Sequence, residues 1–249
     1  MLLLGTLRAA ETNAVPDSAG VQALKLAAQK DPQAQYRLGQ LYASGSGVPQ
    51  NYEVAAQWFK RAAGEKNADA QYSLGFCYAT GAGVTRSLSK AASLYLDAAK
   101  QGHAEAQFKM AVCYEKGLGV LRASPGEAAK WYGKAAEQGV AAAQTVLGNN
   151  ARLGLRYTEA VKWYNLAAVR GVASAQYWLA IFYRNGQGVE RKDLVEAYKW
   201  FSLAAENGYE LAGQQMDELP KLYGMTPEQV AMGKQKAREV QDQLHPPGL

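Results

Sequence analysis

The chain has 249 residues, of which 48% are hydrophobic and 20% charged, and its formal net charge is +5. These fractions are typical of a folded protein and exclude a disordered chain. Lys and Arg are spread along the sequence without a run, so we expect no nucleic-acid partner. No stretch approaches the roughly 20 apolar residues of a membrane-spanning helix, so we expect no transmembrane segment.

The N-terminal residues 1–16 are expected to be flexible, and their start, Met-Leu-Leu-Leu-Gly-Thr-Leu, is similar to the end of a truncated signal peptide. It has no basic lead-in, and its apolar run is shorter than the usual ~7–15 residues. This segment favours an exported, periplasmic protein over a cytoplasmic one, but the compartment stays open. Residues 17–32 follow as an N-capping helix.

One motif then recurs with a period of about 36 residues, which indicates stacked supersecondary units. Each copy opens with an alanine, counted below as position +0, and the five alanines are Ala34, Ala70, Ala106, Ala143 and Ala175. The expected repeats are residues 33–68, 69–104, 105–141, 142–173 and 174–208.

The first helix of each repeat is predicted from three positions. Ala at +0, Leu or Met at +4 and Tyr at +8 lie on one face of a helix with 3.6 residues per turn. Position +5 is Gly or Ala in every copy, so a partner helix can approach closely there. A Gly-x-Gly-Val motif follows in four copies, and its first glycine is expected to end the helix in a left-handed conformation. The motif is not a phosphate-binding loop, because it lacks the required spacing.

The second helix begins at a capping residue and then reads Ala-x-Trp-Tyr-x-x-Ala-Ala. The Trp residues in this register are predicted to be core residues. A glycine ends the helix in four copies, whereas Lys66 holds that place in the first. Cys77 and Cys113 share one register position and are expected to be buried thiols rather than a disulfide.

The fourth copy departs from the pattern. Ala151 replaces the Tyr, Arg156 holds the capping position, and the Gly-x-Gly-Val motif is missing. Because repeat proteins are stabilised by interfaces between neighbours, we expect this repeat to be the least stable. After the last copy, residues 209–244 are expected to form C-terminal capping helices and residues 245–249 a tail.

The recurring pattern resembles the Sel-one-like repeat family, relatives of the tetratricopeptide repeats, over Gln33 to Gly208. The fold expected is all-α, a right-handed superhelical α-solenoid of stacked antiparallel helix hairpins. The resemblance implies a non-catalytic scaffold or adaptor that binds a protein or peptide, without naming the partner. We expect a monomer.

The binding surface is expected on the concave face lined by the first helix of each repeat. Positions +2 and +6 point away from the core face, and most of their residues are aromatic or aliphatic, which is typical of interaction sites. The alternative is that the +2 rings pack between successive repeats, and both can hold. The candidate residues are Tyr36, Gln40, Tyr72, Phe76, Phe108, Val112, Tyr177 and Ile181, with Arg184 at the rim.

No catalytic, metal or cofactor site is predicted. The two histidines, His103 and His245, lie in a turn and in the tail, and no HExxH or CxxC motif is present. A second hypothesis is a carbohydrate-binding or hydrolase-like module of the cell envelope, in which exposed aromatic rings would serve as sugar platforms.

Overall fold

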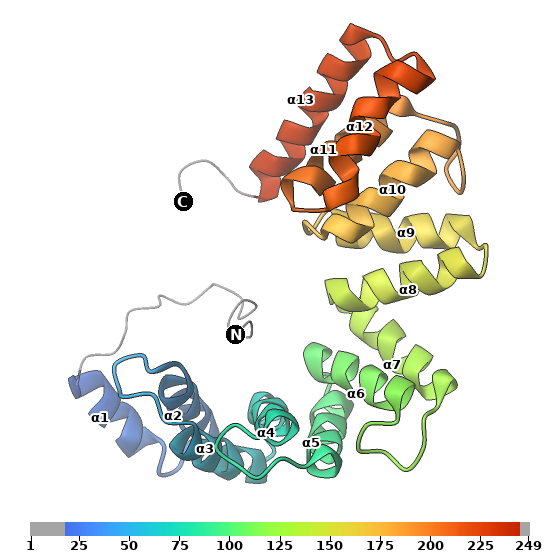
Figure 1. Ribbon diagram of the computed structural model, residues 1–249. Coiled ribbons are helices and arrows are strands. Elements are labelled where there is room, and N and C mark those ends of the chain that lie inside the picture. The colour runs from blue at the N-terminus through green and yellow to red at the C-terminus, as the bar shows by residue number, and fades with distance from the viewer. Residues whose placement is uncertain (1–17, 245–249) are drawn as a thin grey trace. The chain divides into compact units, whose positions relative to one another are not determined.

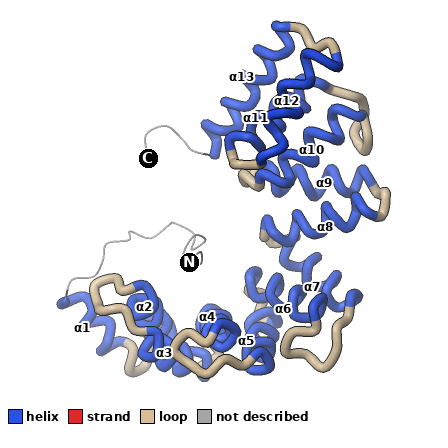
Figure 2. The backbone as a smooth tube through the Cα atoms, in the orientation of Figure 1, coloured by secondary structure: helices blue, strands red, loops and turns tan. Residues whose placement is uncertain are grey.

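The computed structural model describes residues 18–244, and all regular secondary structure in this range is helical (Figure 1, Figure 2). The flexible segment expected over residues 1–16 and the tail over residues 245–249 lie outside the described residues. Successive helices pack as antiparallel pairs, which confirms the all-α, tetratricopeptide-like solenoid predicted from the sequence. Within residues 18–244, no helix is both long and apolar enough to cross a membrane.

The chain divides into two compact units. The first unit contains the residues up to Ala106 together with Lys116–Ala123, and the second contains Gln107–Glu115 and the residues from Ser124 onward. Helix α6 (Ala104–Lys116) therefore contributes to both. The other helices of the first unit are α1 (Ser18–Ala27), α2 (Pro32–Ser44), α3 (Tyr52–Gly64), α4 (Ala68–Thr80) and α5 (Leu88–Lys100).

The second unit continues the alternation of helices and ends in two that lack the motif. Below, the A helices are α2, α4, α6, α8 and α10, which open the five repeats, and the B helices are α3, α5, α7, α9 and α11, which close them. The remaining helices are α7 (Pro125–Glu137), α8 (Ala141–Leu153), α9 (Tyr157–Ala168), α10 (Ala173–Asn185), α11 (Leu194–Glu206), α12 (Glu210–Tyr223) and α13 (Pro227–Leu244).

The small residue at +5 brings the two helices of a hairpin together. A Cβ atom added to Gly39 would lie 2.4 Å from the Phe59 ring, and one on Gly148 would lie 2.8 Å from the Tyr164 ring. These distances are shorter than any van der Waals contact, so the ring of the B helix occupies the space that a side chain would need. The close approach predicted at +5 is confirmed.

The two glycines of the Gly-x-Gly-Val motif have different tasks. The first, such as Gly81 (φ 84°), caps the A helix, and its N–H donates to the Cys77 carbonyl. The second packs against the B helix of the preceding repeat: a Cβ on Gly83 would lie 2.0 Å from the Tyr52 carbonyl oxygen. The motif therefore ends one helix and covers the first turn of another.

The expectation that the Trp residues are core residues is wrong for most of them. Trp58, Trp131 and Trp163 are only half-buried, and Trp200 alone of this register is buried among the described residues. The following aromatic residue enters the core instead, as Tyr164 and Phe201 do with no exposed surface. The half-buried indoles carry cations on their faces, as Arg61 does over Trp58 at 4.6 Å.

A buried glutamine at +1 links neighbouring helices in every repeat. In three repeats its amide donates to a carbonyl at the end of the preceding helix: Gln35 to Ala28 at 3.1 Å, Gln144 to Ala136 at 3.0 Å and Gln176 to Ala168 at 3.0 Å. In the second, third and fifth repeats the glutamine oxygen accepts a hydrogen bond from an amide at the end of the following B helix. The three pairs are Gln101 with Gln71, Gln138 with Gln107, and Asn207 with Gln176.

The first and fourth repeats lack this second bond. Glu65 and Arg170 stand where the other repeats have an amide. A carboxylate cannot donate, and Arg170 donates to the Leu166 carbonyl instead. The side-chain oxygens of Gln35 and Gln144 are buried and have no hydrogen-bond partner among the described residues.

The last two helices close the second unit. Lys236 of α13 donates to Glu196 of α11 at 2.7 Å, and Lys199 contacts the same carboxylate. This pairing lowers the pKa of Glu196 against the opposing effect of burial. Both cysteines are buried free thiols, as predicted.

Candidate functional site

The aromatic residues at +2 pack first against the B helix of their own hairpin. The ring centroids of Tyr36 and Phe59 are 5.8 Å apart, and those of Tyr177 and Phe201 are 5.6 Å apart. The corresponding distances are 5.8 Å for Tyr72 with Tyr95 and 5.7 Å for Phe108 with Tyr132. One edge of each +2 ring therefore belongs to the core.

Two of the +2 rings also stack on the residue just before the helix that follows their hairpin. Tyr72 stacks on His103 with the ring centroids 4.7 Å apart, and Tyr177 stacks on Tyr209 at 4.4 Å. His103 precedes α6 and Tyr209 precedes α12, so the two stacks are equivalent. The packing between successive repeats that the sequence left open occurs at these two positions.

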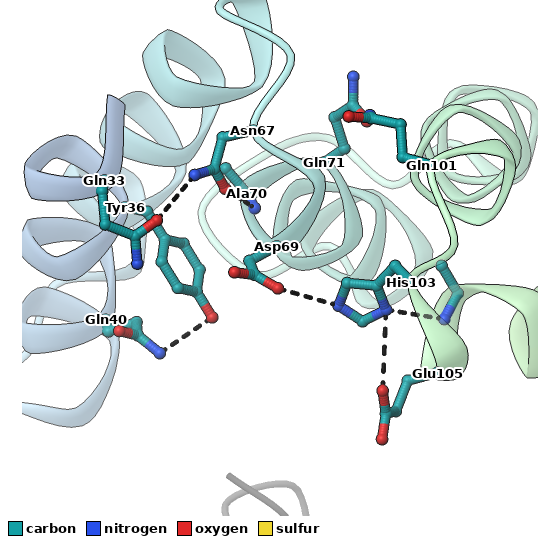
Figure 3. Close-up of polar contacts among 11 residues, drawn as sticks. Gln33, Tyr36, Gln40, Asn67, Asp69, Ala70, Gln71, Gln101, His103 and Glu105 are labelled. Atoms are coloured by element: carbon teal, nitrogen blue, oxygen red, sulfur yellow. Dashed lines mark hydrogen bonds and ion pairs between the residues drawn. The ribbon is translucent and has the colours of Figure 1, made fainter. Parts of the chain in front are cut away.

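His103 is a helix-capping residue, which the sequence did not reveal. Its Nδ1 accepts a hydrogen bond from the Ala106 N–H at 3.1 Å, so the proton of the neutral ring is on Nε2. Nε2 lies 3.4 Å from an Asp69 carboxylate oxygen, and Glu105 lies 3.7 Å from Nδ1. Figure 3 shows His103 between these two acidic side chains, with Tyr36 and Gln40 on the neighbouring A helix.

The exposure of the candidate residues differs along the surface. Tyr36 is buried, with 8% of its surface exposed, and its hydroxyl accepts a hydrogen bond from Gln40 Nε2 at 2.9 Å. Burial and the nearby charge of Asp69 raise the pKa of Tyr36 to about 12. The other candidates are half-buried and keep a face toward solvent: Gln40, Tyr72, Phe76, Phe108, Val112, Tyr177, Ile181 and Arg184.

The charges beside these residues differ between the two units. In the first unit, Asp69 and Glu105 flank the +2 tyrosines, and Glu105 contributes to the raised pKa of Tyr72 after burial. In the second unit, Arg152 and Arg184 stand at position +9 of α8 and α10, on the same side as Tyr177. The second unit also contains Glu115 at +9 of α6 and Glu218 near Tyr177, so its rings lie beside charges of both signs.

Two residues of this surface were missed by sequence reasoning. The Arg152 guanidinium lies 3.9 Å from the centroid of the Trp178 ring, and its Nε donates to the Tyr164 hydroxyl at 3.3 Å. Arg152 and Trp178 come from different repeats, and Arg152 lies in the fourth repeat, which departs from the pattern. The cue in the sequence was the Arg at the +9 position of two successive copies, Arg152 and Arg184.

Within residues 18–244, no three His, Cys, Asp or Glu side chains come together in a group that could hold a metal ion. In each unit the A helices present rings, amides and single charges on their exposed sides, and recognition surfaces use groups of these kinds.

Comparisons with known proteins agree with the repeat pattern. The Sel1 repeat model matches residues 32–67, 68–103, 104–140, 142–171 and 173–209. No curated protein matches the chain.

Two solved structures illustrate the likeness. A Sel1 repeat protein from Oxalobacter formigenes is 33% identical, with a TM-score of 0.68 over 87% of this chain and 90% of that one. A protective antigen with an SLR fold from uropathogenic Escherichia coli is 27% identical, with a TM-score of 0.62 over 93% of this chain. This chain spans 58% of the antigen's length. With five matched repeats over most of its length, the chain belongs to the Sel1 repeat family.

Proposed function

We propose that this protein is a non-catalytic scaffold that binds a protein or peptide along the exposed sides of its A helices. Sel1 repeat proteins are generally protein-interaction scaffolds. The observation that carries the proposal is the row of half-buried aromatic and aliphatic side chains at +2 and +6. Such rings lose little conformational entropy on binding, because the core already fixes one edge of each.

Tyr72 and Phe76 are the residues best suited to test the proposal in the first unit. They stand at +2 and +6 of α4, one turn apart, and both are half-buried. Tyr72 is held by Tyr95 on one side and His103 on the other. A partner that lies across α4 therefore meets a pre-positioned ring.

The experiment uses site-specific photo-cross-linking in the native cell. A benzophenone amino acid in place of Phe76 is expected to cross-link a partner, whereas the same group in place of Tyr52 is not. Tyr52 is the matched control because it is 47% exposed and lies on the B helix α3. The captured partner is then purified, and its affinity is measured for the wild type and for Tyr72→Ala with Phe76→Ala.

The double variant is expected to bind at least tenfold more weakly, since aromatic hot-spot residues contribute more than about 1.4 kcal/mol each. Circular dichroism is expected to show that it keeps its helices. Equal affinity of the double variant and the wild type would refute the proposed surface. Glycan-array binding lost in the same variant would favour the carbohydrate-binding alternative.

A further inference from the structure

A pocket of about 280 Å³ opens in the second unit, where the fourth repeat meets the fifth. Its walls come from the end of α8, from the start of α9 and from α10, and they include Leu153, Leu155, Trp178 and Ile181. Ile181 is one of the +6 residues of the proposed binding surface. The volume falls below the ~300–1,000 Å³ of pockets for small molecules and suits a single large side chain.

The rim of the pocket exposes two leucines. Leu153 is 71% exposed and Leu155 is 69% exposed. Leu155 also has a left-handed backbone conformation (φ 59°), which costs energy for any residue with a Cβ atom. The other repeats place the Gly-x-Gly-Val motif at this connection. The fourth repeat instead presents a leucine to solvent in a strained turn, a combination that points to a binding site.

A single cation lines the apolar pocket. The Arg152 guanidinium lies over Trp178 at 3.9 Å and donates to the Tyr164 hydroxyl, which in turn donates to Asn149 Oδ1 at 2.7 Å. The ring and the hydroxyl hold the guanidinium in place. A fixed guanidinium in an apolar wall is suited to pair with a carboxylate.

No carboxylate of the described residues forms an ion pair with Arg152. The neighbouring Arg156 is paired, with its Nε 2.9 Å from Glu159. One repeat further on, Arg184 contacts the amide oxygens of Gln215 and Asn185 rather than an acid. Arg152 is thus the cation of this pocket, and it has no acidic partner among residues 18–244.

We propose that this pocket binds a bulky apolar side chain of an acidic peptide segment, and that a carboxylate of this segment pairs with Arg152. The inference rests on the proposed function and names the chemistry of the partner for the second unit. The apolar side chain covers Leu153, Leu155 and Ile181, and the carboxylate satisfies the guanidinium. Charge alone does not suffice, because most of the pocket wall is apolar.

The test uses the full-length protein and three fluorescein-labelled nonapeptides. The first has a central leucine with four glutamates on each side. The second has serine in place of the leucine, and the third has glutamines in place of the glutamates. Fluorescence anisotropy is expected to show binding of the first peptide, with at least tenfold weaker binding of the other two. Equal binding of all three would overturn the inference.

Three variants locate the interaction. Arg152→Gln is expected to weaken binding of the first peptide about tenfold and to abolish the preference for glutamate over glutamine. Arg156→Gln makes the same change of charge at a paired arginine and is expected to bind like the wild type. Leu155→Gly removes the exposed side chain, relieves the strained turn and is expected to weaken binding without loss of thermal stability.

The outcomes separate this inference from the proposed function. If no peptide binds although position 76 cross-links a partner, the pocket hypothesis is wrong and the scaffold stands. If Arg152→Gln and Arg156→Gln weaken binding equally, the effect is one of general charge and the pocket assignment is overturned. If Leu155→Gly binds like the wild type, the pocket rim takes no part.

Discussion

Gln101 Nε2 donates a hydrogen bond to the Oε1 of Gln71, 2.6 Å away, and so joins the end of a B helix to the A helix before it. The same bond forms between Gln138 and Gln107 at 2.7 Å. In the fourth repeat Arg170 replaces the amide donor, and the Gln144 oxygen stays buried without a partner. Unmade bonds of this kind cost about 1–3 kcal/mol.

Replacing Arg170 with glutamine is therefore expected to stabilise the protein by about 1 kcal/mol. The new amide would reach Gln144 as Gln138 reaches Gln107. Urea unfolding followed by circular dichroism measures the change in midpoint. Arg156→Gln is the control, because it makes the same change of charge without a buried acceptor nearby. A midpoint that moves equally in both variants would contradict the hydrogen-bond explanation.

Lys66 is expected to be a weak position in the first repeat. Its backbone is left-handed (φ 61°), where the other repeats have glycines such as Gly102 (φ 92°). Lys66→Gly is expected to stabilise the protein by about 1 kcal/mol, because the residue no longer crowds its own backbone. The control, Lys60→Gly in the middle of α3, is expected to destabilise by about 1 kcal/mol. Thermal melting that shifts both variants in one direction would refute this account.

The closeness of the paired helices gives a test with two glycines. A Cβ atom on Gly75 would lie 2.9 Å from the Tyr95 ring, whereas one on Gly64 meets nothing within 4 Å. Gly75→Ala is expected to destabilise the protein by about 1–3 kcal/mol through overpacking. Gly64→Ala is expected to be neutral or stabilising by up to about 1 kcal/mol. Both are measured by urea unfolding, and similar values for the pair would rule out the steric explanation.

The buried thiol of Cys77 predicts a loss of stability at alkaline pH. Burial raises its pKa from 9.0 to about 11. The folded state therefore holds the proton more tightly than the unfolded state, so this contribution to stability is complete below pH 9 and is lost as the pH rises toward 11. The loss is about 1.4 kcal/mol per pH unit at most.

Cys77→Ala separates this effect from other alkaline transitions. The variant is expected to be less stable than the wild type at pH 8, because a buried group is lost. This difference in unfolding free energy is expected to become smaller as the pH rises to 10.5. Unfolding midpoints in urea at several pH values measure the gap. A gap that stays constant would show that the thiol does not titrate as described.

The fourth repeat is expected to exchange its amide hydrogens fastest among the five. Arg156 stands at the start of α9 without a side-chain capping bond, whereas Asn51 and Ser87 cap the equivalent helices. Because fewer interactions stabilise this repeat, it unfolds locally more often than the others. Hydrogen exchange with mass spectrometry is expected to show residues 143–170 less protected than residues 70–100. Equal protection of both segments would refute the expectation.

Much of the fold follows from recurring residues in the sequence. The left-handed glycines and the small residue at +5 were predictable, because each is required by backbone or ring geometry. The sequence did not distinguish which ring of Trp-Tyr enters the core, since both are aromatic. Tyr164 is fully buried because it faces Gly148, whereas Trp163 lies one position away from that contact.

The candidate site was less predictable. The +2 and +6 residues could be placed by helical periodicity, but their contacts with His103 and Tyr209 depend on how the next repeat begins. The pocket beside Arg152 lies where the fourth repeat lacks the Gly-x-Gly-Val motif. A periodic sequence pattern does not predict the structure of a connection that departs from it. The glutamine at +1 recurs in all five copies of the sequence. A polar residue that recurs beside a core alanine indicates a buried hydrogen bond, and this signal could have predicted the links between helices.

The second glycine of three Gly-x-Gly-Val motifs, Gly83, Gly119 and Gly188, makes each preceding repeat depend on the one that follows it. Gly83 packs against the first turn of α3, and Gly188 packs against the first turn of α9. The first turn of a B helix is therefore covered only when the following repeat is folded. The fourth repeat has no such loop, so α7 begins without this cover. Removing repeats one by one from the C-terminal end would accordingly expose the first turn of the preceding B helix in most cases. Removal of the fourth repeat would not, because it has no such loop.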